Sequence, residues 1–264
     1  MKHNHMFIFF SAILYSSLVE IAYCQVQRFG TAIGIVRTNN QIIVGADSRV
    51  NVLKGAFEFE DRDCKIFQFR DFFFTYSGFN SDDPQFDPTS IAKNCLDSGR
   101  SIMAMAECFE GKLKRELTPV LTSFLQKESQ FWARIKKAGF AYAIMGFENE
   151  TPCVISASFK ITESTGVLVE LERRNVFTRM SDREFFIVLG EQSKYDQIKD
   201  HMGTTLSKFS DYGSFIRWYI NEQSSLTPHR VGGHVDILLI EKSGAKWINP
   251  DSRTKCPEVI SMNR

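Results

Sequence analysis

Thr31 and Asp47, a threonine and an aspartate sixteen residues apart, stand at the two ends of a predicted hairpin. The run Thr31–Arg37 is apolar and rich in β-branched residues, and Gln41–Ala46 is a second run of the same kind. Residues 38–40 between them read Thr-Asn-Asn, and asparagine tolerates the left-handed backbone angles of a tight turn. Two such strands pair along their length, so we expect Thr31 and Asp47 to lie close together.

A hydroxyl beside a carboxylate has a chemical use when the threonine is the first residue of a chain. Its free α-amine then accepts the proton of its own hydroxyl, which makes the hydroxyl a nucleophile. That amine titrates at about 7.7–8.0, so much of it is available as a base near neutral pH. Gly30 precedes Thr31, and cleavage between them would free the amine. The alternative is that Thr31 is only a strand residue in a buried hairpin.

The pattern around this hairpin resembles the proteasome β-subunit family of N-terminal nucleophile (Ntn) hydrolases. In that family cleavage after a glycine frees the threonine, and an Ala-Asp-Ser-Arg motif follows at this spacing. The resemblance implies Thr31 as nucleophile, Asp47 as a buried carboxylate and Arg49 as its structural neighbour. It further implies Lys65 as the catalytic lysine and Gly78 as the backbone donor to the oxyanion. The alternative for Lys65 is a solvated charge at the start of an edge strand.

Residues 231–240 resemble the closing Ser-Gly-Gly strand of the same family, and the resemblance implies that Gly232 and Gly233 support the site. Two departures stand out. Val231 occupies the position of the family serine, and Pro228 occupies the position of its second acidic residue. Glu191 falls near the family's helper serine and can supply a carboxylate in its place. The family residues orient the amine of the nucleophile, so their loss weighs against turnover.

The elements that must position these residues follow in the order strands, two helices, strands, two helices, strands. This order predicts an α+β fold, a four-layer αββα sandwich of two antiparallel sheets flanked by helices, which is also the fold of the family. Residues 51–63 and 82–88 are expected as loops. The further strands are expected at 72–77, 140–146, 153–159, 166–171, 185–189 and 235–248, and the helices at 88–117, from Thr118-Pro119 onward, at 192–202 and at 212–221.

The first residues have the pattern of a cleaved secretory signal peptide. Lys2 precedes the apolar run Met6–Val19, and the small residue Ala22 stands two positions before Cys24. The alternatives are an uncleaved membrane anchor, a lipid-modified Cys24, and an N-terminal Cys24 acting as nucleophile. No other segment is long and apolar enough to span a bilayer. The expected organisation is a signal peptide at 1–24, a short propeptide at 25–30 and one proteasome-like Ntn-hydrolase domain at 31–264.

Composition limits the partners and cofactors. A net charge of +1 gives no electrostatic case for binding nucleic acid or an acidic membrane surface. There is no C-x-x-C pair and no His-rich spacing, so we expect no metal site and no cofactor. Six cysteines are present, and if Cys24 leaves with the signal peptide, one or two disulfides with a thiol left over are expected. Cys64 has no activating neighbour in the sequence that would make it a nucleophile.

These observations and the resemblance lead to one expectation about function. The chain is expected to be a secreted or periplasmic N-terminal-threonine hydrolase that cleaves a peptide or small amide substrate after release of Thr31. The resemblance allows a homo-oligomer, although proteasome subunits normally lack signal peptides. Two alternatives stay open: a catalytically silent protein of this fold used for assembly or binding, and an amidase acting on a small molecule.

Overall fold

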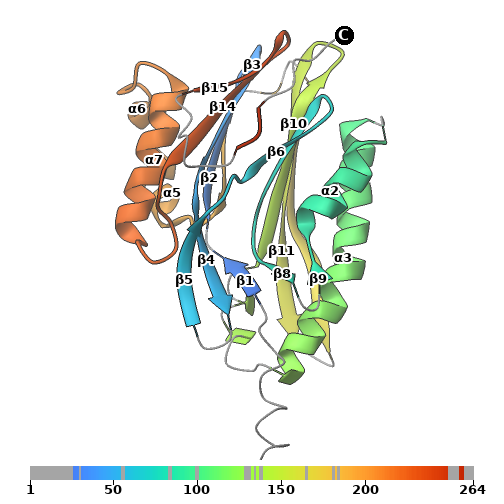
Figure 1. Ribbon diagram of the computed structural model, residues 1–264. Helices are drawn as coiled ribbons and strands as arrows, with labels where there is room; N and C mark the ends of the chain where they lie inside the picture. The colour runs from blue at the N-terminus through green and yellow to red at the C-terminus, as the bar shows by residue number, and fades with distance from the viewer. Residues whose placement is uncertain are drawn as a thin grey trace, which may run out of the picture.

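The computed structural model describes residues 26–29, 31–54, 57–82, 85–98, 101–127, 132–133, 135–136, 139–163, 166–179, 182, 185–248 and 256–258. The predicted signal peptide, with Cys24, and the predicted cleavage position at Gly30 lie outside these residues. The described part is a mixed α+β structure in which antiparallel sheets lie between two groups of helices (Figure 1). This agrees with the predicted α+β class and with its antiparallel sheets.

The first sheet contains the predicted hairpin. Its β-branched runs favour strands, and they pair with the register Ile33 opposite Ala46. Because the sheet is covered on both faces, its central strands are buried throughout rather than alternating. The strand order is β13 (Phe185–Gly190), β2 (Ala32–Arg37), β3 (Gln41–Asp47), β14 (Val235–Glu241) and β15 (Gly244–Ile248).

The second sheet packs against the first. Its edge strand β12 (Val167–Phe177) is longer than the expected 166–171. The prediction ended too early because the second half of the strand is mostly polar and exposed, so it lacks the apolar pattern of a strand. The remaining strands agree with the predictions to within a few residues. The strand order is β12, β11 (Thr151–Glu163), β10 (Phe140–Glu148), β7 (Phe72–Ser77) and β6 (Ile66–Phe69).

A third five-stranded sheet was not predicted. Residues 51–63 and 82–88, expected as loops, instead contribute strands, and the expected propeptide contributes the middle strand of this sheet. The prediction was wrong because these segments are too polar or too short to show a strand pattern without their partners. The strand order is β5 (Phe57–Arg62), β4 (Arg49–Lys54), β1 (Val26–Phe29), β8 (Asn80–Asp82) and β9 (Gln85–Phe86).

Two helices cover the outer face of the second sheet. Helix α2 (Pro88–Leu96) begins as predicted, because the Asp87 carboxylate caps it by accepting hydrogen bonds from the first-turn N–H groups. The chain then bends and continues as α3 (Ile102–Lys127), so the single helix expected at 88–117 is two helices. The restart expected at Thr118-Pro119 is wrong, since α3 runs through Pro119 without a break.

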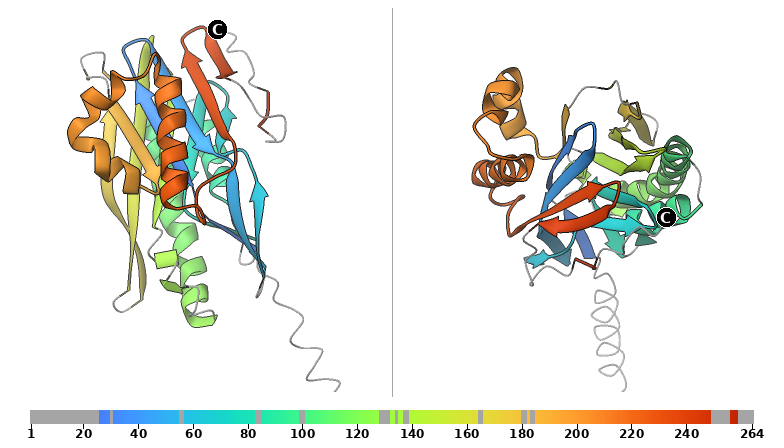
Figure 2. Two further views of the ribbon diagram at one scale, coloured as in Figure 1. Left: turned by 90° about the vertical axis from the view of Figure 1, so that its left-hand side faces the viewer. Right: turned by 90° about the horizontal axis from the view of Figure 1, so that it is seen from above.

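Helices on the opposite side cover the first sheet, as the view from above shows (Figure 2). The helix expected at 192–202 is divided into shorter pieces. Helix α7 begins at Tyr212 as predicted, continues beyond the expected end at residue 221, and packs on β2 and β3. Three apolar clusters fill the interior. One lies between α2, α3 and the second sheet, one between the first and second sheets, and one between the first sheet and the helices that cover it. The pieces are α5 (Ser193–Ile198), η1 (Lys199–His201), α6 (Met202–Leu206) and α7 (Tyr212–Leu226).

Two disulfides join described cysteines. Cys64 is bonded to Cys256, and Cys95 to Cys108, while Cys153 is a buried thiol. This confirms the expectation of one or two disulfides with a thiol left over. Disulfides form and persist in oxidising compartments, so the pairing fits an extracellular or periplasmic protein. Among the helices of the described residues, none combines the length and the apolar character that a membrane crossing requires.

Candidate functional site

The β2–β3 hairpin places Thr31 beside Asp47. The Ala32 backbone N–H donates a hydrogen bond of 2.8 Å to Asp47 Oδ1, and Thr31 is the residue immediately before it. Thr31 is buried at 7% relative exposure, and Asp47 is more deeply buried at 1%. The proximity expected from the pairing of the two strands is therefore present in the fold.

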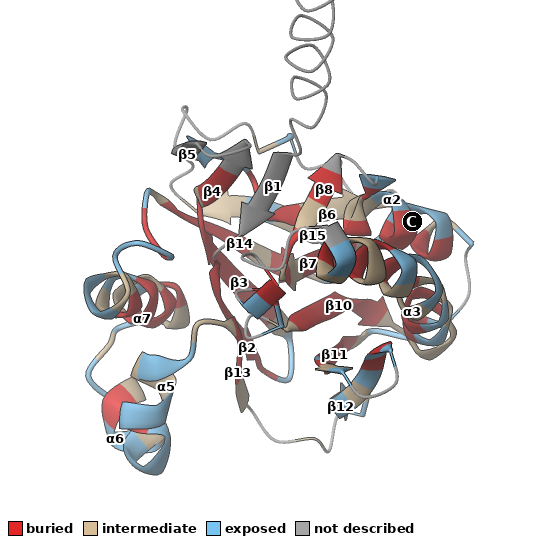
Figure 3. Ribbon diagram, turned by 90° about the horizontal axis from the view of Figure 1, so that it is seen from below, coloured by how far each residue is buried: buried red, intermediate tan, exposed pale blue. Residues whose placement is uncertain are grey.

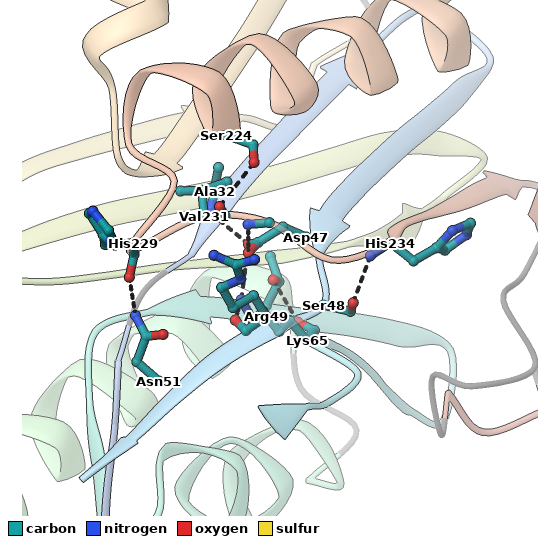
Figure 4. A network of polar contacts seen from close by, with 12 residues as sticks. Ala32, Asp47, Ser48, Arg49, Asn51, Lys65, Ser224, His229, Val231 and His234 are labelled. Atoms are coloured by element: carbon teal, nitrogen blue, oxygen red, sulfur yellow. Dashed lines mark hydrogen bonds and ion pairs between the residues drawn. The ribbon is translucent and has the colours of Figure 1, made fainter. Parts of the chain in front are cut away.

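Lys65 lies directly before β6 and points at the same carboxylate (Figure 4). Its Nζ donates to Asp47 Oδ1 at 2.9 Å and to the Arg49 carbonyl at 2.5 Å. The backbone of Lys65 is held in turn, because Thr75 Oγ1 on β7 donates to its carbonyl at 2.7 Å. Lys65 is buried, so it is not the solvated edge charge that was the alternative interpretation.

The Asp47 carboxylate has a further donor from a distant part of the chain. The Gly232 N–H donates to Asp47 Oδ2 at 3.0 Å, so both carboxylate oxygens accept hydrogen bonds. Burial raises the pKa of Asp47, because the carboxylate loses its hydration, while Lys65 and the two backbone donors act in the opposite direction. Burial likewise lowers the pKa of Lys65, opposed mainly by Asp47, so this ammonium releases its proton more readily than a surface lysine would.

The two glycines of the 231–233 segment pack closely on the side chains of Ser48 and Arg49. A Cβ on Gly232 would lie 2.8 Å from the Arg49 guanidinium carbon, and one on Gly233 would lie 2.6 Å from Ser48 Oγ. Gly233 also has a φ of +77°, which favours glycine. Both glycines therefore let the backbone approach residues 48 and 49 closely, and the Gly232 N–H in addition contacts Asp47.

Arg49 holds in place the loop that precedes Gly232. Its backbone N–H donates to the Gly232 carbonyl at 3.0 Å, and its guanidinium donates to the Pro228 carbonyl. Asn51 Nδ2 donates to the His229 carbonyl at 2.6 Å. Pro228 therefore contributes a backbone acceptor rather than a side chain, and Arg49 joins it to the start of β4.

Val231 is turned away from the polar cluster. It is fully buried in the apolar layer beneath α7, and its carbonyl accepts a hydrogen bond from Ser224 Oγ. A hydroxyl at this position would need a polar partner in that layer, and valine removes the requirement. The side chain at the position of the family serine therefore contributes packing, not orientation of an amine.

Glu191 contacts Thr31 through its backbone. Its N–H donates to the Thr31 carbonyl at 3.0 Å, and its carboxylate pairs with Arg230 at 2.6 Å. Arg230 stands directly before Val231, so this ion pair joins the segment after β13 to the segment that contacts Asp47. The sequence did not single out Arg230, because an exposed arginine in a loop carries no local signal.

Gly78 follows the last residue of β7 and has a φ of +145°. A Cβ at this position would lie 2.5 Å from the ring of Phe140, so the packing excludes other residues. Its neighbour Ser77 lies close to Gly190, which itself packs on Thr31. Hydrogen bonds to Asp47 join Ala32, Lys65 and Gly232 into one network next to Thr31. Gly78 lies near Thr31 through Ser77 and Gly190.

Gly190 is a site residue that the sequence analysis missed. It has a φ of +82°, and a Cβ there would lie 2.0 Å from the Thr31 carbonyl oxygen. We expect Gly190→Ala to lower the free energy of unfolding by at least about 2 kcal/mol, because left-handed backbone and steric overlap both add cost. Gly111→Ala on α3, where a Cβ meets nothing within 4 Å, is the control and should be neutral or stabilising. Urea unfolding measures both, and equal stability of the two variants would contradict the expectation.

Strand β1 leads directly toward Thr31. Its last residue, Phe29, pairs with Asn51 of β4, and Arg28 pairs with Asn80 of β8. The strand is therefore hydrogen-bonded on both sides and ends two positions before Thr31. Residues 26–29 of the expected propeptide therefore lie in extended conformation between β4 and β8.

Other candidates have structural roles. Cys64 cannot act as a nucleophile while it is bonded to Cys256. His234 donates its backbone N–H to Ser48 Oγ, and its ring lies 3.9 Å from the Asp236 carboxylate. Within the described residues, no cluster of His, Cys, Asp and Glu could hold a metal ion.

Comparison of the chain with protein-family models gave no match. A search of curated proteins likewise found none.

Proposed function

We propose that this chain is an exported N-terminal-threonine hydrolase with a proteasome-like Ntn fold, and that it cleaves amide bonds. The observation that carries the proposal is the buried hydrogen-bonded pair of Lys65 and Asp47 directly beside Thr31. Burying an ion pair is costly and rarely justified by stability alone, so such a pair beside a hydroxyl is typical of a functional site. The two packed antiparallel sheets between helices are compatible with this fold.

The proposed reaction uses the chain's own terminus. Once the bond before Thr31 is cut, its free α-amine accepts the proton of Oγ1, and Oγ1 attacks the carbonyl carbon of the substrate. The Gly78 N–H stabilises the oxyanion that forms. The amine then returns the proton to the leaving nitrogen, which leaves an ester on Thr31 that water hydrolyses. Lys65 favours loss of the hydroxyl proton by its positive charge, and Asp47 holds Lys65 in place.

Strand β1 supports a peptide as the substrate. An extended segment already lies between β4 and β8 with its chain running toward Thr31. Adding a strand between two others supplies backbone hydrogen bonds that do not depend on the side chains of the peptide. A peptide that takes the place of β1 after cleavage would direct its carbonyl group toward the same hydroxyl. This favours a peptidase over an amidase for small molecules.

A silent protein of the same fold is the second candidate. Val231 and Pro228 provide no polar side chain to orient the amine, and Glu191 is paired with Arg230. In this case the pair of Lys65 and Asp47 would serve the structure alone, and residues 26–29 would stay as a permanent strand. The two candidates therefore differ in the state of the chain before Thr31.

The N-terminus of the mature protein tests the proposal. We expect intact mass and N-terminal sequencing of protein secreted by the native host to give a chain that begins at Thr31. The same cleavage should proceed in purified precursor, because the nucleophile and the cut bond belong to one molecule. A mature, folded protein that begins at Gln25 or Val26 would reject the hydrolase and support the silent candidate.

A further inference from the structure

A cavity separate from the Thr31 network opens between the two packed sheets. Its volume is about 260 Å³, and it lies where the edge strands β12 and β13 meet. Figure 3 shows these two strands as neighbouring edges of the two sheets. Residues on both sheets and on α5 line it, and those with polar or aromatic groups used below are Ser156, Arg173, Asn175, Phe177, Phe185 and Tyr195.

One wall of the cavity is polar and carries a cation. Arg173, Asn175 and Phe177 alternate along β12, so all three face the same side. Arg173 Nε donates to Asn175 Oδ1 at 3.1 Å, and Asn175 Nδ2 donates to Ser156 Oγ at 3.2 Å. Arg173 is exposed, and among the described residues no carboxylate lies within ion-pair distance of it. The next residue, Arg174, faces the other way and is paired with Glu110.

Aromatic side chains line the part of the cavity where β12 and β13 meet. The rings of Phe177 and Phe185 are stacked with their centres 3.6 Å apart, and both side chains are only half-buried. Phe186 and Tyr195 also border the cavity, and their rings, with centres 6.2 Å apart, pack on the other face of the first sheet in the apolar layer beneath α7. A cavity with an apolar body and a few convergent polar groups is typical of a small-molecule site.

We propose that this cavity binds a small amphipathic anion, an aromatic or branched aliphatic carboxylate. The carboxylate pairs with the Arg173 guanidinium, whose planar fork of donors suits that group. The apolar body of the ligand packs on Phe177 and Phe185. Leu189 and Gln192 line the cavity on either side of Gly190 and Glu191, which contact Thr31. A bound ligand therefore adjoins the hydrolase site without filling it, and the proposal does not depend on turnover.

Calorimetric titration with a matched pair of probes tests the site. We expect 3-phenylpropanoate to bind with a dissociation constant of about 1 mM or below, and the neutral 3-phenylpropanamide at least about fivefold more weakly. The two probes share one apolar body and differ in charge. Equal binding of both, or no heat of binding from either, would overturn the proposal.

Substitutions locate the binding on this cavity. Arg173→Gln should weaken the carboxylate about fivefold to tenfold and leave the amide unchanged, whereas Arg173→Lys should keep part of the preference. Arg115→Gln, on the exposed face of α3 and outside the cavity lining, should change neither probe. Ser158→Trp at the cavity lining should abolish binding of both by filling the space. Arg173 is exposed, so its variants should fold, and undiminished binding by Arg173→Gln would reject the assignment.

Discussion

Replacing Thr31 with Ala is expected to abolish both cleavage before residue 31 and all amide hydrolysis, while leaving the chain folded. Thr31 supplies the only hydroxyl and amine that the proposed reaction uses, and its backbone contacts do not depend on the side chain. Removing the nucleophile from an enzyme that acts through a covalent ester lowers the hydrolysis rate by about 10⁴-fold or more. Thr31→Ser retains a hydroxyl, so it should keep part of both activities.

Covalent labelling independently tests whether Thr31 is the nucleophile. A β-lactone or epoxyketone should form one adduct, located at Thr31 by peptide mass mapping, and none on Thr31→Ala. Thr122→Ala removes a threonine hydroxyl that donates to the Thr118 carbonyl within α3, and it should be cleaved and labelled like the unchanged protein. An adduct on any other residue, or cleavage of purified Thr31→Ala at the same bond, would remove Thr31 from the mechanism.

The second large effect is expected at the buried pair. Lys65→Met should lower the free energy of unfolding by about 3–5 kcal/mol, because it leaves the Asp47 carboxylate buried without its cation. The double variant Asp47→Asn with Lys65→Met should lose less than the sum of the single variants, since neither charge is then left alone. All three should lack cleavage before Thr31. Denaturant unfolding and intact mass measure the two properties separately.

Lys65→Arg separates a mechanistic lysine from a structural charge. Arginine keeps the positive charge, but it is bulkier and stays protonated at all working pH values. Because Lys65 Nζ already contacts both Asp47 and the Arg49 carbonyl, we expect Arg to abolish cleavage and hydrolysis while circular dichroism still reports the fold. Lys199→Met removes an exposed lysine that also pairs with an aspartate, and it should change neither property. A fully processed and active Lys65→Arg protein would favour the silent candidate.

The hairpin that carries Thr31 and Asp47 could be predicted because its information is local. Two β-branched runs around an Asn-rich turn specify their own pairing, and the observed register follows from that turn. The strands Phe72–Ser77 and Phe140–Glu148 were likewise readable from short apolar runs. The contact between Lys65 and Asp47 is different, because the two residues are 18 positions apart and no local pattern links them. Only the resemblance to a family suggested that contact.

The remaining elements of the fold depend on partners far away in the chain. Strand β1 has few residues and pairs with β4 and β8, so nothing in its own sequence indicates a strand. Pro119 was read as a break, but the packed apolar face of α3 offsets the one hydrogen bond that proline removes. The choice of Cys256 as the partner of Cys64, 192 residues away, also follows from the folded arrangement.

The sequence by itself therefore indicated which residues could do chemistry and which apolar runs become strands. Side-chain type and the alternation of apolar and polar residues are local properties of the chain, so they are the same in any fold that buries the apolar face. The tertiary structure alone decided how those residues meet. Asp47 accepts hydrogen bonds from Ala32, Lys65 and Gly232, whose contacts span 15, 18 and 185 residues. Contacts at such separations arise only when the sheets pack, because that packing places the three donors around one carboxylate and excludes water from it.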